Sequence, residues 1–433
     1  MSQKKTLQEK LSKRKYKVPN RLLYNVLSKF VIGKMLEPKY NVHYEIVDDI
    51  NKEKGPCFLI FNHQSRIDYV WTVRAAYPRR LNFVVGYNEF FRSHLHLILK
   101  IANAIPKKNF TIDLPAMRGI DSIIKQGGVV CFSPEGMSSI SGHNQPIVPS
   151  TGKLFKHYGV PVYMVKTEGA FLTNTKVCLD ERKGRINAKM VRLFTKEDLQ
   201  KLSDREIDEK INEALWQDDY EWNLKEKVSY ETNGRICEHL SDLLYRCPKC
   251  GHEFEMESGG DKIVCKHCGN GATMDDTYAF RKLHEDDVIP STPTRWFDEE
   301  RKEVYRELSK NPDYVFECDV KLGALPKYRY LKDKKTSEIV GAGRLRVDKN
   351  GVHYIGTRDN KPFSFDISYK TLPTYGMPTD MTYIALYDKN EYFDLYPAKP
   401  VVGKLLLVTE EFARLTENTW PNFPWMKWVY EKE

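Results

Sequence analysis

A histidine and an aspartate five residues apart are the first side chains in this sequence that could do chemistry together. His63 and Asp68 follow the apolar run Cys57-Phe58-Leu59-Ile60-Phe61. An imidazole beside a carboxylate is suited to general base catalysis, because the carboxylate fixes the tautomer and supports the protonated ring. Five residues correspond to about 500° of helical rotation. The pair can therefore meet only if His63 lies in a turn and Asp68 in the first turn of a following helix.

The elements that must position this pair are a strand and a helix. The apolar run suits a buried strand, which would deliver His63 at its C-terminal end, where ligands gather in open α/β sheets. The pattern after the turn predicts a helix over 66–76 that ends before Pro78. Ser65 and Asp68 also fit a capping box, in which Asp68 reaches back to the helix backbone. Capping accounts for Asp68 but gives no reason for His63.

A second motif follows in the sequence after His63. There a short strand over 129–132 runs into Ser133-Pro134-Glu135-Gly136. In this order the two motifs resemble the glycerolipid acyltransferase family, of the lysophosphatidic acid acyltransferase type. The resemblance covers roughly residues 40 to 200. It includes an apolar helical stretch that leads into Lys107 and Lys108, and the proline-containing strand over 159–165.

The resemblance implies a role for each of these residues. His63 would remove the proton from an acceptor hydroxyl, and Asp68 would orient the imidazole. The site residues implied for substrate binding are Glu135, Gly136, Lys107 and Lys108. The donor would be acyl-CoA or acyl carrier protein, and the acceptor a lysolipid such as 1-acylglycerol-3-phosphate, in phospholipid biosynthesis. An activated thioester donor agrees with the absence of a Walker loop, a dinucleotide glycine pattern and a nucleophile elbow.

Two departures from the family pattern leave an alternative open. The family has Thr-Arg-Ser after its Glu-Gly, whereas this chain has Met137-Ser138-Ser139, and lysines stand where the second block has an arginine. Lysine supplies charge but no bidentate fork, so an acceptor without a phosphate is compatible with the sequence. The alternative function is a catalytically degenerate, membrane-associated scaffold that binds partners through its C-terminal modules.

Four of the nine cysteines form two Cys-x-x-Cys pairs, each followed by glycine: Cys247, Cys250, Cys265 and Cys268. This spacing predicts a zinc ribbon with a structural, four-thiolate zinc ion, the disulfide alternative being less compatible with a reduced setting. The other five cysteines lie singly, mostly in apolar runs. The ribbon is not basic and aromatic, so no nucleic-acid partner is expected.

The net charge of +9 is concentrated in residues 1–40, which hold eleven Lys and Arg against two acids. Within this segment, Leu22, Leu23, Val26, Leu27, Phe30 and Val31 form a stripe at helical spacing. A basic amphipathic helix is typical of an anionic membrane surface, the alternative being that the stripe packs on the catalytic domain. The sequence holds no apolar run long enough to span a membrane and no signal-peptide pattern. We therefore expect a cytoplasmic protein, peripheral on the inner face of the cell membrane.

These patterns predict a multidomain protein. The expected parts are a membrane-interface segment (1–40), an α/β acyltransferase domain (41–240), a zinc ribbon (241–287) and a β-rich domain (295–433). Alternating strands and helices predict a largely parallel sheet in the second part. Six short β-type runs over 315–395, followed by a helix with Val402, Leu405, Leu406, Phe412 and Leu415 on its apolar face, resemble the pleckstrin-homology-like fold.

Overall fold

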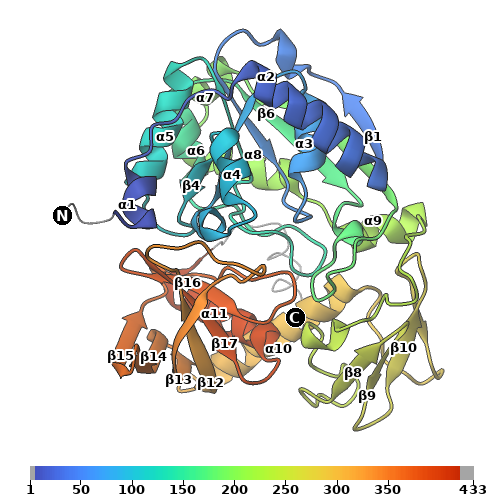
Figure 1. The fold of residues 1–433 in the computed structure, drawn as a ribbon. Helices are drawn as coiled ribbons and strands as arrows, with labels where there is room; N and C mark the ends of the chain where they lie inside the picture. The colour runs from blue at the N-terminus through green and yellow to red at the C-terminus, as the bar shows by residue number, and fades with distance from the viewer. Residues whose placement is uncertain (1–4, 420–433) are drawn as a thin grey trace.

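The computed structural model describes residues 5–419, and it contains three β-sheets (Figure 1). An α/β domain lies at the top of the view, a six-stranded sheet below it, and a small four-stranded sheet beside the six-stranded one. The chain begins with α1 (Leu7–Ser12), α2 (Arg21–Val26) and the π-helical η1 (Leu27–Leu36). No helix among residues 5–419 is both long and apolar enough to cross a membrane.

The α/β domain is built on a seven-stranded sheet with the order β1-β7-β6-β2-β5-β3-β4. Its strands are β1 (Asn41–Ile46), β2 (Cys57–Phe61), β3 (Leu81–Gly86), β4 (Ile105–Lys107), β5 (Val129–Phe132), β6 (Val162–Glu168) and β7 (Arg185–Phe194). Neighbouring strands are parallel except for β6 and β7. The expected α/β class with a largely parallel sheet is confirmed.

Strand β2 lies at the centre of the sheet because both of its faces are apolar. Cys57, Leu59 and Phe61 belong to one hydrophobic cluster, and Phe58 and Ile60 to another on the opposite face. A parallel sheet covered on both sides requires such a continuous apolar strand, and alternate residues then pack into different cores.

Helices cover the two faces of this sheet. They are α3 (Tyr69–Ala76), α4 (His96–Ile101), α5 (Leu114–Lys125), α6 (Thr151–Tyr158), α7 (Lys196–Lys201) and α8 (Asp204–Leu215). Helix α9 (Asp219–Glu226) lies between this domain and the four-stranded sheet (Figure 1). Short helical turns are η2 (Glu37–Lys39), η3 (Ile50–Lys52), η4 (Tyr87–Phe91), η5 (Phe171–Thr173) and η6 (Leu240–Asp242). Helix α3 begins three residues later than the sequence predicts, because the preceding turn holds Ser65 to Asp68. Helix α8 is amphipathic, with Ile207, Ile211 and Leu215 buried under its charged face.

The four-stranded sheet carries the cysteine pairs. Its strands β8 (Met256–Gly259), β9 (Lys262–Cys265), β10 (Gly271–Met274) and β11 (Phe280–Lys282) are antiparallel. Helix α10 (Pro293–Lys310) follows, capped by the side chain of Thr292. Thr292 and Thr294 are completely buried, so the segment that precedes α10 is packed into the molecule.

The six-stranded sheet is antiparallel with the order β15-β14-β13-β12-β17-β16. Its strands are β12 (Phe316–Ala324), β13 (Glu338–Asp348), β14 (Gly351–Arg358), β15 (Lys361–Ile367), β16 (Ile384–Asp388) and β17 (Glu391–Pro397), followed by α11 (Val402–Glu417). The expected β-rich domain with a final helix is present, while its pleckstrin-homology-like identity stays a prediction. Helix α11 is buried on every side from Val402 to Ala413, and Leu415, expected on its apolar face, is exposed.

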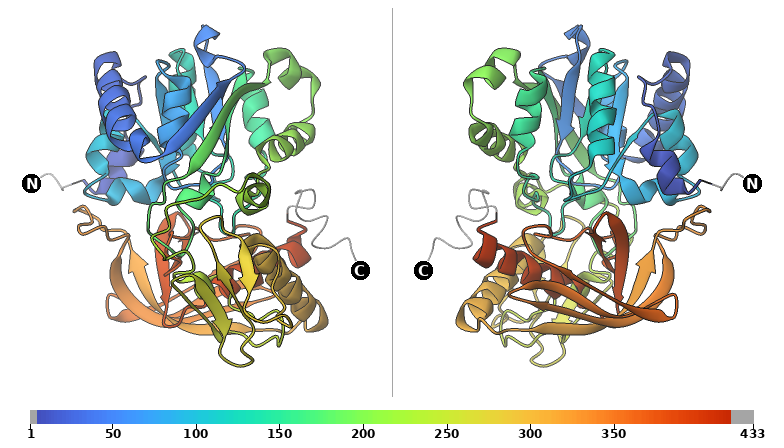
Figure 2. Two further views of the ribbon diagram at one scale, coloured as in Figure 1. Left: turned by 90° about the vertical axis from the view of Figure 1, so that its right-hand side faces the viewer. Right: turned by 90° about the vertical axis from the view of Figure 1, so that its left-hand side faces the viewer.

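The α/β domain lies above the other two sheets in both views of Figure 2, and buried hydrophobic clusters join it to them. One hydrophobic cluster runs from Met137 and Phe171 of the α/β domain through the cysteine sheet to α11. A second cluster joins Leu7 and Phe91 to Leu331, and the backbone of Leu331 donates a hydrogen bond to the carbonyl of Phe91 at 2.8 Å. The loops at the C-terminal end of β5 therefore face other modules rather than open solvent.

Candidate active site and metal centre

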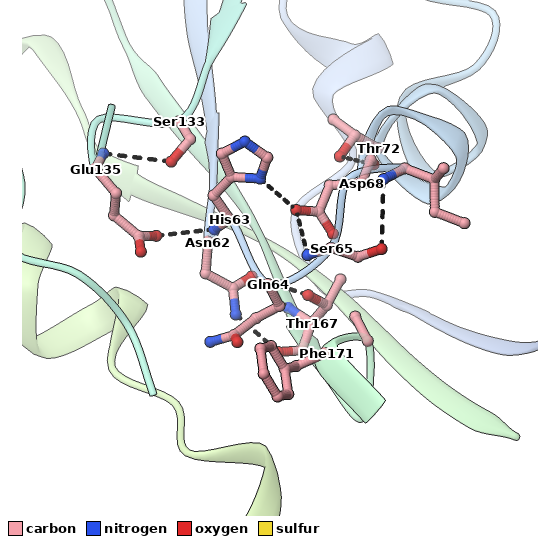
Figure 3. Close-up of polar contacts among 12 residues, drawn as sticks. Asn62, His63, Gln64, Ser65, Asp68, Thr72, Ser133, Glu135, Thr167 and Phe171 are labelled. Carbon is pink, nitrogen blue, oxygen red and sulfur yellow. Dashed lines mark hydrogen bonds and ion pairs between the residues drawn. The ribbon is translucent and has the colours of Figure 1, made fainter. Parts of the chain in front are cut away.

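His63 and Asp68 converge in the turn between β2 and α3 (Figure 3). The Nδ1 atom of His63 lies 2.9 Å from Oδ2 of Asp68, and the same oxygen accepts the backbone N–H of Ser65 at 3.0 Å. One carboxylate thus both contacts the imidazole and caps the turn, so the two interpretations of Asp68 are compatible. Burial raises the pKa of Asp68, opposed by its hydrogen bonds to His63 and Ser65.

The backbone of His63 is held on both sides. Its N–H donates to Oε1 of Glu135 at 2.8 Å, and its carbonyl accepts the N–H of Ser139 at 2.7 Å. The preceding side chain, Asn62, donates to the carbonyl of Thr167 at 2.8 Å and accepts the N–H of Thr167 at 2.8 Å. These bonds connect the end of β2 to β6 and to the loop after β5, and they fix the direction in which the imidazole points.

The second ring nitrogen of His63 is available to a substrate. Because a carboxylate only accepts, Nδ1 carries the proton and Nε2 presents a lone pair. The His63 side chain is 29% exposed, and no residue within 5–419 hydrogen-bonds to Nε2. The arrangement can therefore accept a proton from a bound hydroxyl group.

Glu135 lies inside the protein, directed at the backbone that carries His63. It is 1% exposed, and besides His63 it accepts the Asn144 side-chain N–H at 2.9 Å and the Gln145 N–H at 3.0 Å. Burial raises the pKa of Glu135 to about 7, opposed by these N–H donors. Gly136 has a φ of +76°, and a Cβ there would approach Phe110 to 3.3 Å. Both residues thus shape the site through protein contacts.

The two lysines of the second block contact backbone carbonyls. Lys107 Nζ donates to the carbonyls of Lys108 and Thr111, and burial lowers its pKa. Lys108 Nζ donates to the carbonyl of Asn390, in the turn between β16 and β17, at 2.9 Å. Lys108 thereby joins the α/β domain to the six-stranded sheet, a contact between distant segments that the sequence did not suggest.

A buried histidine connects the loop after β5 to α10. His143 Nε2 lies 3.1 Å from Asp298 Oδ1, and Nδ1 lies 2.9 Å from the carbonyl of Asn144. Both ring nitrogens face acceptors, which suits an imidazolium. Burial by itself would lower the pKa of His143. The nearby carboxylates of Asp298 and Asp218 outweigh this effect, so the pKa of His143 lies above its usual value. Thr294, next to α10's first residue, donates to the carbonyl of Ser141 at 2.8 Å.

Sequence reasoning missed these positioning residues. Asn62, Ser139, His143, Asn144 and Asp298 carry no motif of their own. The one available signal was a group of polar residues, His143-Asn144-Gln145, in a stretch expected to be a loop. Their partners are up to 155 residues away, so no local pattern could have identified them.

The four cysteines of the two Cys-x-x-Cys pairs lie together and can hold a metal ion. The Sγ atoms of Cys247 and Cys268 are 3.6 Å apart and those of Cys250 and Cys265 are 3.8 Å apart. A tetrahedral zinc site with Zn–S bonds of about 2.3 Å has sulfur atoms roughly 3.8 Å apart. All four cysteines are free of disulfides.

The two turns that present the cysteines have the same geometry. Gly251 N–H donates to the carbonyl of Cys247, and Gly269 N–H to that of Cys265, each at 2.9 Å. Both glycines have a φ of +75°, which a residue with a Cβ adopts only with strain. The imidazoles of His252 and His267 stack beside the cluster, with centroids 3.5 Å apart. The pairs thus form two matching knuckles that face one another.

The raised pKa of Glu135 predicts a pH-dependent contribution to stability. Between its ordinary value of 4.5 and its value of about 7 in the folded protein, the unfolded chain ionises while the buried carboxyl stays protonated. Relative to Glu135→Gln, the wild type should therefore lose stability as pH rises through this window, by on the order of 3 kcal/mol, and change little above it. Denaturant unfolding of both proteins from pH 4.5 to 8.5 measures this difference. A difference that does not vary with pH would contradict the assignment.

Comparison with known proteins identifies the domain that carries His63. Residues 41–167 match the family model described as Acyltransferase. The chain is similar to the 1-acyl-sn-glycerophosphate (LPA) acyltransferase PlsC from Thermotoga maritima, at 17% identity over 45% of this chain and 76% of that chain, with a TM-score of 0.35. It is also similar, over 24% of its length, to 99% of a Ran binding domain from a nuclear pore complex component of Ashbya gossypii, at 16% identity and a TM-score of 0.18. No curated protein matches. The family match shows that residues 41–167 belong to the acyltransferase family.

Proposed function

We propose that the protein transfers a fatty acyl group from acyl-CoA or acyl carrier protein to a hydroxyl of a lysophospholipid such as 1-acylglycerol-3-phosphate, in phospholipid biosynthesis. The observation that carries this proposal is the 2.9 Å contact between His63 Nδ1 and Asp68 Oδ2, with Nε2 left open, in an acyltransferase-family domain. The similar Thermotoga protein is described as acting on 1-acyl-sn-glycerophosphate. An intact and supported pair argues against the degenerate scaffold, because capping of the turn by Asp68 would not require an imidazole beside it.

In this mechanism the acceptor hydroxyl attacks the thioester carbonyl carbon while Nε2 of His63 takes the hydroxyl proton. The buried Asp68 carboxylate stabilises the resulting imidazolium through Nδ1–H. The new C–O bond forms, the C–S bond breaks, and the imidazolium returns its proton to the departing thiolate. The products are an acyl ester and a free thiol, so atoms and charge balance.

The anionic part of either substrate would bind near the cationic second block. Lys107 donates to two backbone carbonyls and Lys108 to the carbonyl and side-chain oxygen of Asn390, so each ammonium retains one N–H donor for a phosphate. Glu135 and Gly136 support acceptor binding indirectly, by holding the His63 backbone and the neighbouring turn. Each lysine offers a single positive charge and no bidentate fork. We therefore expect the acceptor phosphate to be attracted by charge, without the geometric selectivity that an arginine would give.

Replacing His63 with Ala should lower kcat/KM at least a hundredfold, because a general base contributes about 10²–10⁴-fold. The folded structure should persist, since the imidazole is at the surface end of the turn. Activity is measured with radiolabelled acyl-CoA or acyl carrier protein and a panel of lysolipids. His157→Ala, an exposed histidine on α6, is the matched control and should retain activity. Turnover that survives in His63→Ala would refute this mechanism.

The N-terminal segment presents the surface that we propose contacts an anionic membrane, with the protein cytoplasmic and peripheral on the inner face of the cell membrane. Asn20 caps α2, accepting the N–H groups of Leu22 and Leu23. On α2 and η1, Leu22, Val26 and Phe30 are 73%, 44% and 53% exposed, so they do not pack on the α/β domain. Exposed apolar side chains among lysines and arginines suit the boundary between head groups and acyl chains.

The double change Leu22→Ser and Phe30→Ser should weaken binding to anionic liposomes roughly tenfold or more, because two large apolar side chains no longer enter the lipid. Liposome flotation of the full chain provides the measurement. Ile355→Ser is the control, since Ile355 is equally exposed, at 72%, on the distant six-stranded sheet. Equal flotation of all three proteins would speak against the proposed surface.

The cysteine cluster supports a structural zinc ion bound by Cys247, Cys250, Cys265 and Cys268. Four thiolates complete a tetrahedral shell and leave no position for a substrate. The ion would hold together the two knuckles, because the four-stranded sheet between them is small. We assign no chemical step to it.

Purified protein should contain about one zinc ion per chain by elemental analysis, and Cys247→Ser should lose it together with several degrees of thermal stability. Cys318→Ser removes a cysteine outside the cluster and should keep the ion. Full zinc content in Cys247→Ser, or none in the wild type, would exclude this site.

A further inference from the structure

A cavity of about 520 Å³ lies far from His63 in the α/β domain. It is lined by the α2–η1 segment, the turn before β3 and the turn before β5, including Gly128 and Val129. Strands β2, β3 and β5 are parallel, so their starts share one edge of the sheet, whereas His63 follows the end of β2. The cavity is therefore on the opposite edge from the proposed acyl-transfer site.

The polar lining of the cavity is cationic: it contains Arg21, Lys29, Arg79, Arg80, Asn25 and Asn51. No carboxylate among residues 5–419 belongs to the lining. Asp49 accepts a hydrogen bond from the Asn51 side chain but does not itself line the cavity. Four cations that converge without an acid create a positive potential that favours an anion.

Two of these cations are held in place by the backbone. Arg79 donates to the carbonyl of Gly55, and Arg80 donates to the carbonyl of Pro19 at 2.8 Å. Each guanidinium has five N–H donors, so both keep donors for a ligand. Arg21 and Lys29, on the other wall, form no ion pair with any residue that the structure describes, and Lys29 Nζ lies 5.7 Å from the centre of the Tyr77 ring. The lining thus combines guanidinium groups held by the backbone with cations that have no acidic partner, and such groups suit the oxygens of a phosphate.

The size and surroundings of the cavity indicate a larger ligand than inorganic phosphate. Its volume falls in the range of small-molecule sites. Arg21, Asn25 and Lys29 are spaced by four residues and share one helical face, and Leu22, Val26 and Phe30 occupy the adjacent, exposed face. A ligand with its phosphate among the cations can lay acyl chains along these apolar side chains. The segment lies on the side of the α/β domain away from the six-stranded sheet (Figure 1).

We propose that this cavity binds a phosphate ester, the head group of an anionic lipid, at a site separate from the acyl-transfer centre. The affinity of the cavity for a phosphate follows from its four cations alone. The identification of that phosphate as a lipid head group rests on the membrane surface proposed above. A lipid bound here would hold α2 and η1 at the bilayer and attach the enzyme where its substrates are.

The test measures binding to the full-length protein by calorimetry, with no acyl donor present, so that acyl transfer does not affect the result. The probes are dihexanoyl phosphatidic acid below its micelle concentration, inorganic phosphate, and dihexanoyl phosphatidylcholine. Arg21→Ala with Lys29→Ala removes two cations from the cavity. Lys15→Ala with Lys17→Ala removes the same charge from exposed positions of the same basic segment outside the cavity.

We expect the phosphatidic acid to bind most tightly and the Arg21/Lys29 variant to bind it at least tenfold more weakly, with the Lys15/Lys17 variant close to wild type. Equal weakening in both variants would overturn the site, because it indicates diffuse attraction only. If inorganic phosphate bound as tightly as phosphatidic acid, the ligand would not be a lipid head group. If none of the probes bound, the whole proposal would be refuted. None of these outcomes depends on the fate of His63→Ala, so failure here and failure of the proposed activity are distinguishable.

Discussion

A single buried carboxylate holds together the segments on which the candidate active site depends. Glu135 accepts the backbone N–H of His63 and the N–H groups of Asn144 and Gln145. Three donors that converge on one acceptor leave little freedom for the ends of β2 and β5 to move apart. Once Glu135 ionises, above its pKa of about 7, these hydrogen bonds become charge-assisted, and such bonds are about twice as strong as neutral ones. The free-energy cost of burying this carboxyl appears as its raised pKa.

The C-terminal modules extend this support beyond the α/β domain. Ser139 holds the carbonyl of His63, and the same loop reaches α10 through His143 and Asp298. The family has an arginine at the position of Ser138, but here the neighbouring Met137 packs into the large hydrophobic cluster that loops of the α/β domain share with the two C-terminal sheets. The loop therefore holds the histidine from the side of the additional modules. This gives a physical account of the departure from the family pattern.

Buried ion pairs determine how the modules fit. Arg301 of α10 contacts Glu410 at 2.6 Å and Glu411 at 3.1 Å on α11, and all three are almost inaccessible to water. Such pairs add little net stability, because desolvation offsets their attraction, but a displaced partner would leave a charge buried alone. They discriminate strongly between the observed arrangement of helices and any shifted one. The position of α10, and with it that of Asp298, is fixed in this way.

The sequence by itself determined the features that depend on near neighbours. Three such features are encoded within a few positions of the sequence. They are the burial of the five apolar residues of β2, the contact between His63 and Asp68 across one turn, and the tight turn at the glycine after each cysteine pair. Thermodynamically these elements need only a core to pack against, and the pattern shows where that core lies.

Only the tertiary structure decided which distant groups support them. Glu135 reaches His63 across 72 positions and Asp298 reaches His143 across 155, and Lys108 finds its acceptor in another sheet. The exposure of Phe30 and the meeting of Arg21 with Arg79 likewise depend on how the N-terminal segment lies on the α/β domain. Contacts of this kind follow from the packing of whole elements. The local sequence around a polar side chain does not indicate which distant residue will become its partner.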